Sequence, residues 1–156
     1  MLIDTSVLVA LFKDRSGVAA HALRTILDGR DYCLTRFTQM ELLQGARDEK
    51  EWLKLSDYLA DQDYLEAGEE IWAAAARLYF DLRRKGLTVR SVIDCCIAEI
   101  AITHDATLLH NDRDFATIAK LRSLKHVQFD ALVQPEASSL PIGHKLSSEL
   151  ASEKLY

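Results

Sequence analysis

The chain has 156 residues, of which 49% are apolar and 28% are charged, the composition of one globular domain that can bury its own core. The net charge of −5 disfavours nucleic-acid binding by bulk charge, but it does not exclude a nuclease, because cations bound to clustered acids reverse the local sign. No apolar run reaches membrane-spanning length and no basic segment precedes the first one, so we expect neither a transmembrane helix nor a signal peptide.

Short apolar runs alternate with helical patterns along the chain. We predict strands at the short runs, namely residues 2–3, 32–35, 64–65, 107–109 and 127–129. We predict helices where apolar residues recur every three or four positions, namely residues 7–11, 18–27, 38–46, 52–59, 69–85, 91–103 and 114–121. The helix over 91–103 is apolar on most faces, which is typical of a helix buried between neighbours. The alternation predicts parallel crossovers, and therefore a three-layer α/β/α sandwich with a short, mostly parallel sheet.

The composition changes near the end of the chain. From Pro135 onward, serine, alanine and scattered charges replace the apolar periodicity. We therefore expect one domain over residues 1–133, followed by a peripheral or partly ordered tail over residues 134–156.

Acidic residues stand where strands pass into helices. Asp4 follows the first strand, Glu41 and Asp94 lie in predicted first turns, and Asp112 follows the strand over 107–109. In a parallel sheet these positions share one edge, where α/β folds bind their ligands. Carboxylates that meet there repel one another unless a divalent cation neutralises them. The pattern favours a metal-dependent enzyme.

Each acid also has a purely structural explanation. Residues 38–41 and 91–94 have the form of capping boxes, and Asp4 and Asp112 are placed as helix N-caps. Capping alone does not require an acid at nearly every crossover, so the set as a whole favours the metal site.

Four segments, in order and at the right intervals, resemble the motifs of PIN-domain ribonucleases, and in particular the VapC-type toxins of bacterial and archaeal toxin–antitoxin modules. These segments are residues 2–8, 41–45, 94–98 and 111–115. The resemblance extends from Met1 to about Asp130, so the segment after Pro135 lies outside it. It implies the PIN-like form of the three-layer fold.

The resemblance implies a catalytic and metal-binding set made of Asp4, Glu41, Asp94 and Asp112. It adds Asp114 as an assisting ligand and leaves open which of the last two acids lies closer to the metal. It also implies that Ser6, and less directly Thr5, are auxiliary polar groups that orient a carboxylate.

The implied reaction is Mg²⁺- or Mn²⁺-dependent hydrolysis of RNA that leaves a 5′-phosphate and a 3′-hydroxyl. Carboxylate oxygens suit these hard cations and not zinc. The resemblance further implies a cognate VapB-type antitoxin, a homodimer and a cytoplasmic location. We expect the antitoxin to lie along the apolar faces of the helices over 38–46 and 52–59.

Among the basic residues, Arg36 and Arg113 are our candidates for RNA binding, because each adjoins the predicted acidic edge. A solvated cationic surface is the alternative explanation for these and for the basic stretch that ends at Arg90. The histidines at 104, 110 and 126 have no spacing typical of a metal site or a catalytic triad. The cysteines at 33, 95 and 96 fit neither a disulfide framework nor a zinc site.

Two other functions remain to be weighed. A phosphohydrolase with an aspartyl nucleophile requires a second aspartate two positions after Asp4, where this chain has Ser6. A receiver domain requires an acidic pair and a late lysine that the sequence does not offer. The stronger alternative is a catalytically silent PIN-like module that binds RNA or protein, and loss of metal-dependent cleavage on substitution of Asp4 or Asp94 would distinguish the enzyme from it.

Overall fold

Three strands pair in parallel in the computed structural model, which describes residues 1–130. They are β1 (Leu2–Ile3), β2 (Leu108–His110) and β3 (His126–Gln128), and β2 lies between the other two. The predicted tail over 134–156 and its boundary at 133 lie outside the described residues.

The predicted strands at 32–35 and 64–65 form single parallel bridges instead of strands. Cys33 bridges Leu2, and Leu34 bridges Tyr64, so the two segments continue the sheet beyond β1. The ladder is short because a helix begins at Arg36, immediately after the bridges, and turns the chain out of the sheet.

The described residues contain seven helices. They are α1 (Thr5–Lys13), α2 (Val18–Leu27), α3 (Arg36–Gln44), α4 (Glu49–Ala60), α5 (Glu69–Arg84), α6 (Val92–Thr103) and α7 (Arg113–Ile118). None of these helices combines the length and the apolar character that crossing a membrane requires.

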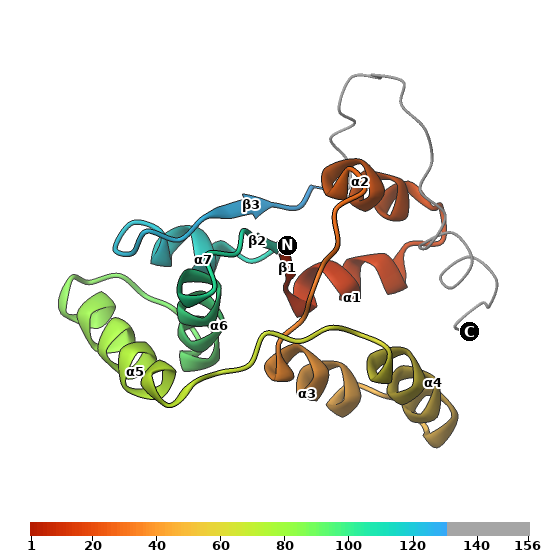
Figure 1. Ribbon diagram of the computed structural model, residues 1–156, viewed down its shortest axis with the longest axis horizontal. Coiled ribbons are helices and arrows are strands. Elements are labelled where there is room, and N and C mark those ends of the chain that lie inside the picture. The colour runs from red at the N-terminus through yellow and green to blue at the C-terminus, as the bar shows by residue number, and fades with distance from the viewer. Residues whose placement is uncertain (131–156) are drawn as a thin grey trace.

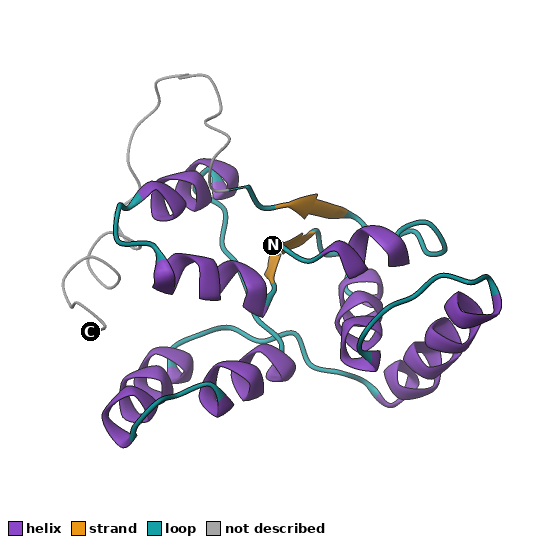
Figure 2. Cartoon of the chain, turned by 180° about the vertical axis from the view of Figure 1, so that it is seen from behind, coloured by secondary structure: helices purple, strands orange, loops and turns teal. Residues whose placement is uncertain are grey.

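The helices form two layers around the sheet, as Figures 1 and 2 show from opposite sides. Successive strand residues point to opposite faces. Leu2 and Leu108 pack into a core with α5, α6 and α7, whereas Ile3 and Leu109 pack into a second core with α1, α2, α3 and α4. The predicted three-layer α/β/α sandwich is confirmed.

Helix α6 is buried on nearly all sides, as its apolar composition predicts. Every residue from Cys95 to Ala101 is buried. Because α6 leads into β2 in a parallel α/β unit, it runs against the strand direction, and its N-terminus lies at the edge where the strands end. Asp94, in the first turn of α6, is carried to that edge.

Candidate active site

Asp4 lies directly after β1 and caps helix α1. Its Oδ2 accepts hydrogen bonds from the Ser6 backbone N–H (2.9 Å) and from the Ser6 hydroxyl (2.5 Å). The carboxyl group is almost fully buried, and burial raises its pKa. The predicted N-cap is therefore present, and Ser6 holds the capping carboxylate at the end of β1.

Glu41 is not part of a capping box, so that explanation of this acid is wrong. Helix α3 begins at Arg36, with Thr35 as its N-cap and the Thr38 N–H bound to the Thr35 hydroxyl (3.2 Å). Glu41 thus lies in the second turn, beyond the reach of the cap. Its Oε2 accepts a hydrogen bond from the Thr5 hydroxyl, which ties α3 to the start of α1. Burial raises its pKa.

Asp94 lies at the point where the other acids converge. Its pKa is raised to about 7, first by burial and then by repulsion from Asp112, Asp4, Asp114 and Glu41, in that order. Ser91 caps α6 through the Ile93 N–H (3.1 Å). Because all four other carboxylates act on Asp94, the structure brings together acids that the sequence places in four different segments.

Asp112 and Asp114 share a partner that the sequence did not indicate. The Nη2 of Arg90 donates to both oxygens of Asp112, at 2.6 and 2.5 Å. The backbone N–H and Nε of Arg90 donate to Oδ2 of Asp114, at 2.9 and 3.1 Å. From the sequence, Arg90 belongs only to a basic stretch that a solvated surface would explain. Its position just before α6, four residues ahead of Asp94, is the one sequence signal that points to this role.

The two acids differ in their surroundings. The side chain of Asp114 is 11% exposed, whereas that of Asp112 is 27% exposed. Asp112 also caps α7 by accepting from the Asp114 N–H (3.0 Å), as predicted. Asp114 is therefore the more buried acid, and Asp112 is the more accessible to solvent.

A hydroxyl joins the ends of β1 and β2. The Asn111 N–H donates to the Ser6 hydroxyl (2.8 Å), and that hydroxyl donates to Asp4. The segment that carries Asp112 is thus tied to the segment that carries Asp4. Ser6 and Thr5 each hold one acid of the cluster, and what they contribute to catalysis stays a prediction.

The donor set fits a hard divalent cation in kind. Within residues 1–130, no group of three or more His, Cys, Asp or Glu side chains is already arranged to hold a metal ion. Four of the acids instead bind neighbouring donors, since Ser6 holds Asp4, Thr5 holds Glu41, and Arg90 holds both Asp112 and Asp114. A cation would relieve the repulsion that raises the pKa of Asp94, and oxygen ligands are those that Mg²⁺ and Mn²⁺ prefer.

The predicted RNA-binding arginines lie at the surface. Arg36 pairs with Glu66 (2.9 Å) and lies over the ring of Tyr64, 3.8 Å from its centroid. Both partners of the Arg36–Glu66 pair are more than half exposed, so the pair contributes little to stability. Arg113 is exposed at the first position of α7, beside Asp112. Their predicted contact with RNA remains a prediction.

Comparison with known proteins relates this chain to a family. Residues 1–121 match the family model described as PIN domain. The chain is similar to Ribonuclease VapC11 of Mycobacterium tuberculosis and to VapC ribonuclease Mb1587 of Mycobacterium bovis. Each is 36% identical over 132 residues, which cover 83% of this chain and 98% of the relative.

Solved structures have the same fold. The chain is similar to VapBC2 from Rickettsia felis, crystallised with a DNA fragment from its promoter, with a TM-score of 0.67, 18% identity, and coverage of 83% of this chain and 98% of that chain. It is also similar to VapBC-5 from Mycobacterium tuberculosis, with a TM-score of 0.61, 24% identity, and coverage of 81% and 96%.

Proposed function

This chain belongs to the PIN-domain family, and from that premise we propose that it is a divalent-metal-dependent endoribonuclease toxin of the VapC kind, inhibited by a VapB antitoxin. The observation that carries the proposal is that four carboxylates lie close enough to Asp94 to repel its charge, at the edge where the strands end. We further propose that the protein acts on RNA in the cytoplasm and, from the family resemblance, that it forms a homodimer.

We assign the metal to Asp4, Asp94 and Asp112, with Glu41 beside them. The cation is Mg²⁺ or Mn²⁺, and when bound it supplies an activated water and neutralises charge on the phosphate. Ser6 holds the carboxylate of Asp4, and Thr5 holds that of Glu41, so both acids keep a fixed direction. The Glu41 carboxylate, held by the Thr5 hydroxyl beside the proposed ligands, would accept the proton that leaves the attacking water.

The products follow from attack of water on phosphorus. The bond between phosphorus and the 3′-oxygen breaks, the 3′-oxygen takes up a proton, and the phosphate stays on the 5′ side of the next nucleotide. No side chain of this protein becomes covalently attached to RNA.

RNA cleavage is tested with the purified chain and total RNA. We expect cleavage with Mg²⁺ or Mn²⁺ that stops when EDTA is added, and fragments whose 5′-phosphates allow direct ligation of an adaptor. Sequencing these ends identifies the RNA and the cleaved position. RNA that binds with unchanged affinity but stays intact with either metal would instead indicate a silent binding module.

Asp112 and Asp114 have different roles in this proposal. We expect Asp112→Asn to lower kcat/KM more than about 100-fold, because even groups behind metal ligands contribute 10- to 100-fold. We expect Asp114→Asn to lower it only about tenfold, because Asp114 is the more buried of the two acids and binds the backbone N–H of Arg90, so that it supports the site from behind. Cleavage rates measured across a Mn²⁺ titration test this. Equal losses in the two variants would contradict the assignment.

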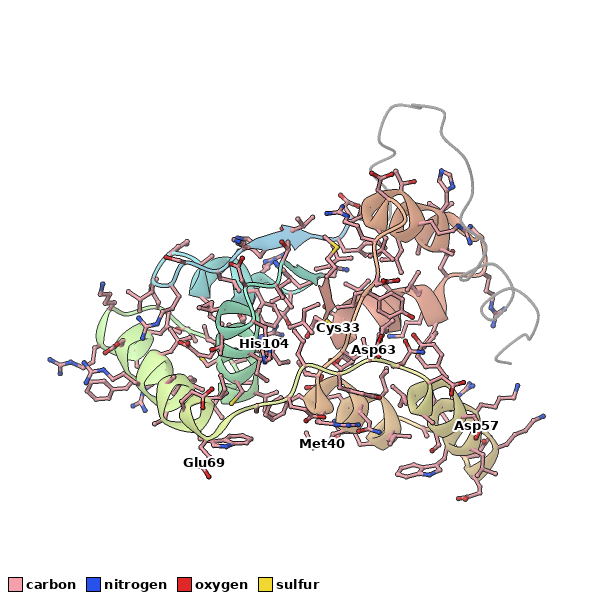
Figure 3. The ribbon with its side chains drawn as sticks, in the orientation of Figure 1. Cys33, Met40, Asp57, Asp63, Glu69 and His104 are labelled. Atoms are coloured by element: carbon pink, nitrogen blue, oxygen red, sulfur yellow. The ribbon has the colours of Figure 1, made fainter. Side chains whose placement is uncertain are left out.

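The antitoxin-binding surface is proposed on α3 and α4, as the sequence suggested. Three large apolar side chains are exposed there, Met40 at 46%, Trp52 at 42% and Leu53 at 55%. Figure 3 labels Met40 on α3 and Asp57 on α4. Leu42, Leu55 and Leu59 on the same helices are buried in the core, so the exposed residues are not needed to hold the helices in place.

A further inference from the structure

Two histidines outside the acidic cluster form a pair, in which His110 is buried and His126 is partly buried. The spacing of His110 and His126 did not indicate a contact, but the parallel strands β2 and β3 bring them together. Nε2 of His110 lies 2.9 Å from Nδ1 of His126, and the ring centroids are 5.1 Å apart. His110 is 0% exposed, and its ring also packs against Phe115 at 5.0 Å.

The hydrogen bonds fix the proton on each ring. The backbone N–H of Asp112 can only donate, and it points at Nδ1 of His110 (3.3 Å). Nδ1 of His110 is therefore unprotonated, and its proton is on Nε2. That N–H donates to Nδ1 of His126, which must in turn carry its own proton on Nε2. Burial and the neighbouring His126 lower the pKa of His110 to about 4, in agreement with a neutral ring.

The histidine pair contacts the segment that carries Asp112. This segment is fixed at the Asn111 N–H by Ser6, at the Asp112 carboxylate by Arg90, and at the Asp112 N–H by His110. The first two contacts involve groups of the acidic cluster and its immediate partners. The third leads away from it, through His110 to His126 on the next strand.

We propose that His126 is a positioning residue that acts through His110 to hold the backbone of Asp112, and so sets how well the acidic cluster binds its cation. The metal-binding part rests on the function proposed above. Without the acceptor on His126, the buried N–H of His110 has no partner, and an unpaired buried donor is costly. The ring then turns toward another acceptor and releases the Asp112 N–H.

The experiment compares His126→Leu with His126→Asn. Leucine removes the acceptor, whereas the Oδ1 of asparagine lies near the position of Nδ1 and restores it. His21→Leu is the control, because His21 is exposed on α2. The readouts are hydrogen exchange of the Asp112 amide by NMR, Mn²⁺ affinity by calorimetry, and kcat and KM for RNA.

We expect His126→Leu to speed exchange of the Asp112 amide and to weaken Mn²⁺ binding about tenfold, with kcat lowered more than KM is raised. We expect His126→Asn and His21→Leu to stay within about twofold of wild type, well below that tenfold effect. Unchanged exchange and Mn²⁺ affinity in a folded His126→Leu protein would overturn the proposal.

Two outcomes distinguish a failure of the role proposed for His126 from a failure of the proposed nuclease function. If the wild type binds Mn²⁺ but cuts no RNA, the nuclease proposal fails while amide exchange and Mn²⁺ affinity still test His126. If His126→Leu does not fold, ¹⁵N shifts of the wild-type rings decide the matter. We expect the proton of each ring on Nε2, and a proton on Nδ1 of His110 would contradict the proposed hydrogen-bond chain.

Discussion

Asp94→Asn is expected to abolish RNA cleavage and, in the same protein, to raise the stability of the metal-free state at neutral pH. Cleavage should fall by more than about 100-fold, because the variant loses a proposed metal ligand. Stability should rise because four carboxylates repel Asp94 and burial further disfavours its charge. Asparagine keeps the size of the side chain and removes that charge. Function and stability thus pull in opposite directions at this residue.

The stability gain has a defined pH dependence. The pKa of Asp94 is about 7 in the folded protein and near its ordinary value of 3.8 in the unfolded chain. Between these values the folded state holds more protons, so the contribution of Asp94 to the free energy of unfolding falls as pH rises from about 4 to about 7. The Asn variant lacks this loss. The difference between variant and wild type should therefore grow across that range and level off above it.

The free energy of unfolding must be compared between the variant and the wild type, because a second buried group, His110, changes stability with pH in the opposite direction. The pKa of His110 is lowered from 6.5 to about 4, so its contribution to stability increases as pH rises through that interval. His110 is present in both proteins, and its contribution cancels when the variant is compared with wild type. A pH profile of the wild type alone would mix the two effects.

Thermal unfolding in EDTA across this pH range, with cleavage of a labelled RNA under Mn²⁺, measures both expectations. Asp57→Asn is the matched control, because Asp57 is exposed on α4 (Figure 3) and should change neither quantity. Added Mn²⁺ should stabilise the wild type more than the Asp94 variant. An Asp94→Asn protein that is less stable than wild type at pH 7.5 without metal would show that the carboxylates do not converge as described.

Trp52→Asp is expected to weaken antitoxin binding by at least about 2 kcal/mol, or roughly 30-fold, while leaving RNA cleavage by the free protein unchanged. Trp52 is 42% exposed on α4, beside the exposed Leu53, and large aromatic side chains of this kind dominate binding energies. A carboxylate at this position would have to be buried without a partner when the antitoxin docks. Calorimetric titration with the cognate antitoxin measures the loss.

The chain offers a control in another exposed aromatic side chain. Phe80 on α5 is 52% exposed, and its ring lies 5.5 Å from the guanidinium carbon of Arg77 on the same helix. We expect Phe80→Asp to keep antitoxin affinity within about threefold of wild type, far from the hot-spot range. Equal losses in the two variants would place the antitoxin elsewhere, or would point to a general effect on folding that circular dichroism would reveal.

The sequence alone was sufficient for the fold class, and it singled out the acids that lie near Asp94 in the structure; their catalytic and metal-binding roles stay predictions. The pattern shows short apolar strands, helices between them, and one helix that is apolar on most faces. Together these features define a layered α/β protein, because local burial sets each pattern. Asp4 and Asp112 were predicted as caps and are caps. Glu41 was given a wrong local explanation, because the start of α3 at Arg36 is set by the Thr35 cap and not by the apolar period.

Apart from Ser6 and Thr5, which the family resemblance already indicated, the groups that hold the acids in place became apparent only in the tertiary structure. Arg90 reaches Asp112 across 22 residues of sequence, Ser6 reaches Asn111 across 105, and His110 reaches His126 across 16. No periodicity links such positions, because their contacts arise when separate crossovers of a parallel sheet end at one edge. The chain's pattern therefore determined which carboxylates are present at that edge. The packing of its segments determined which groups donate hydrogen bonds to them.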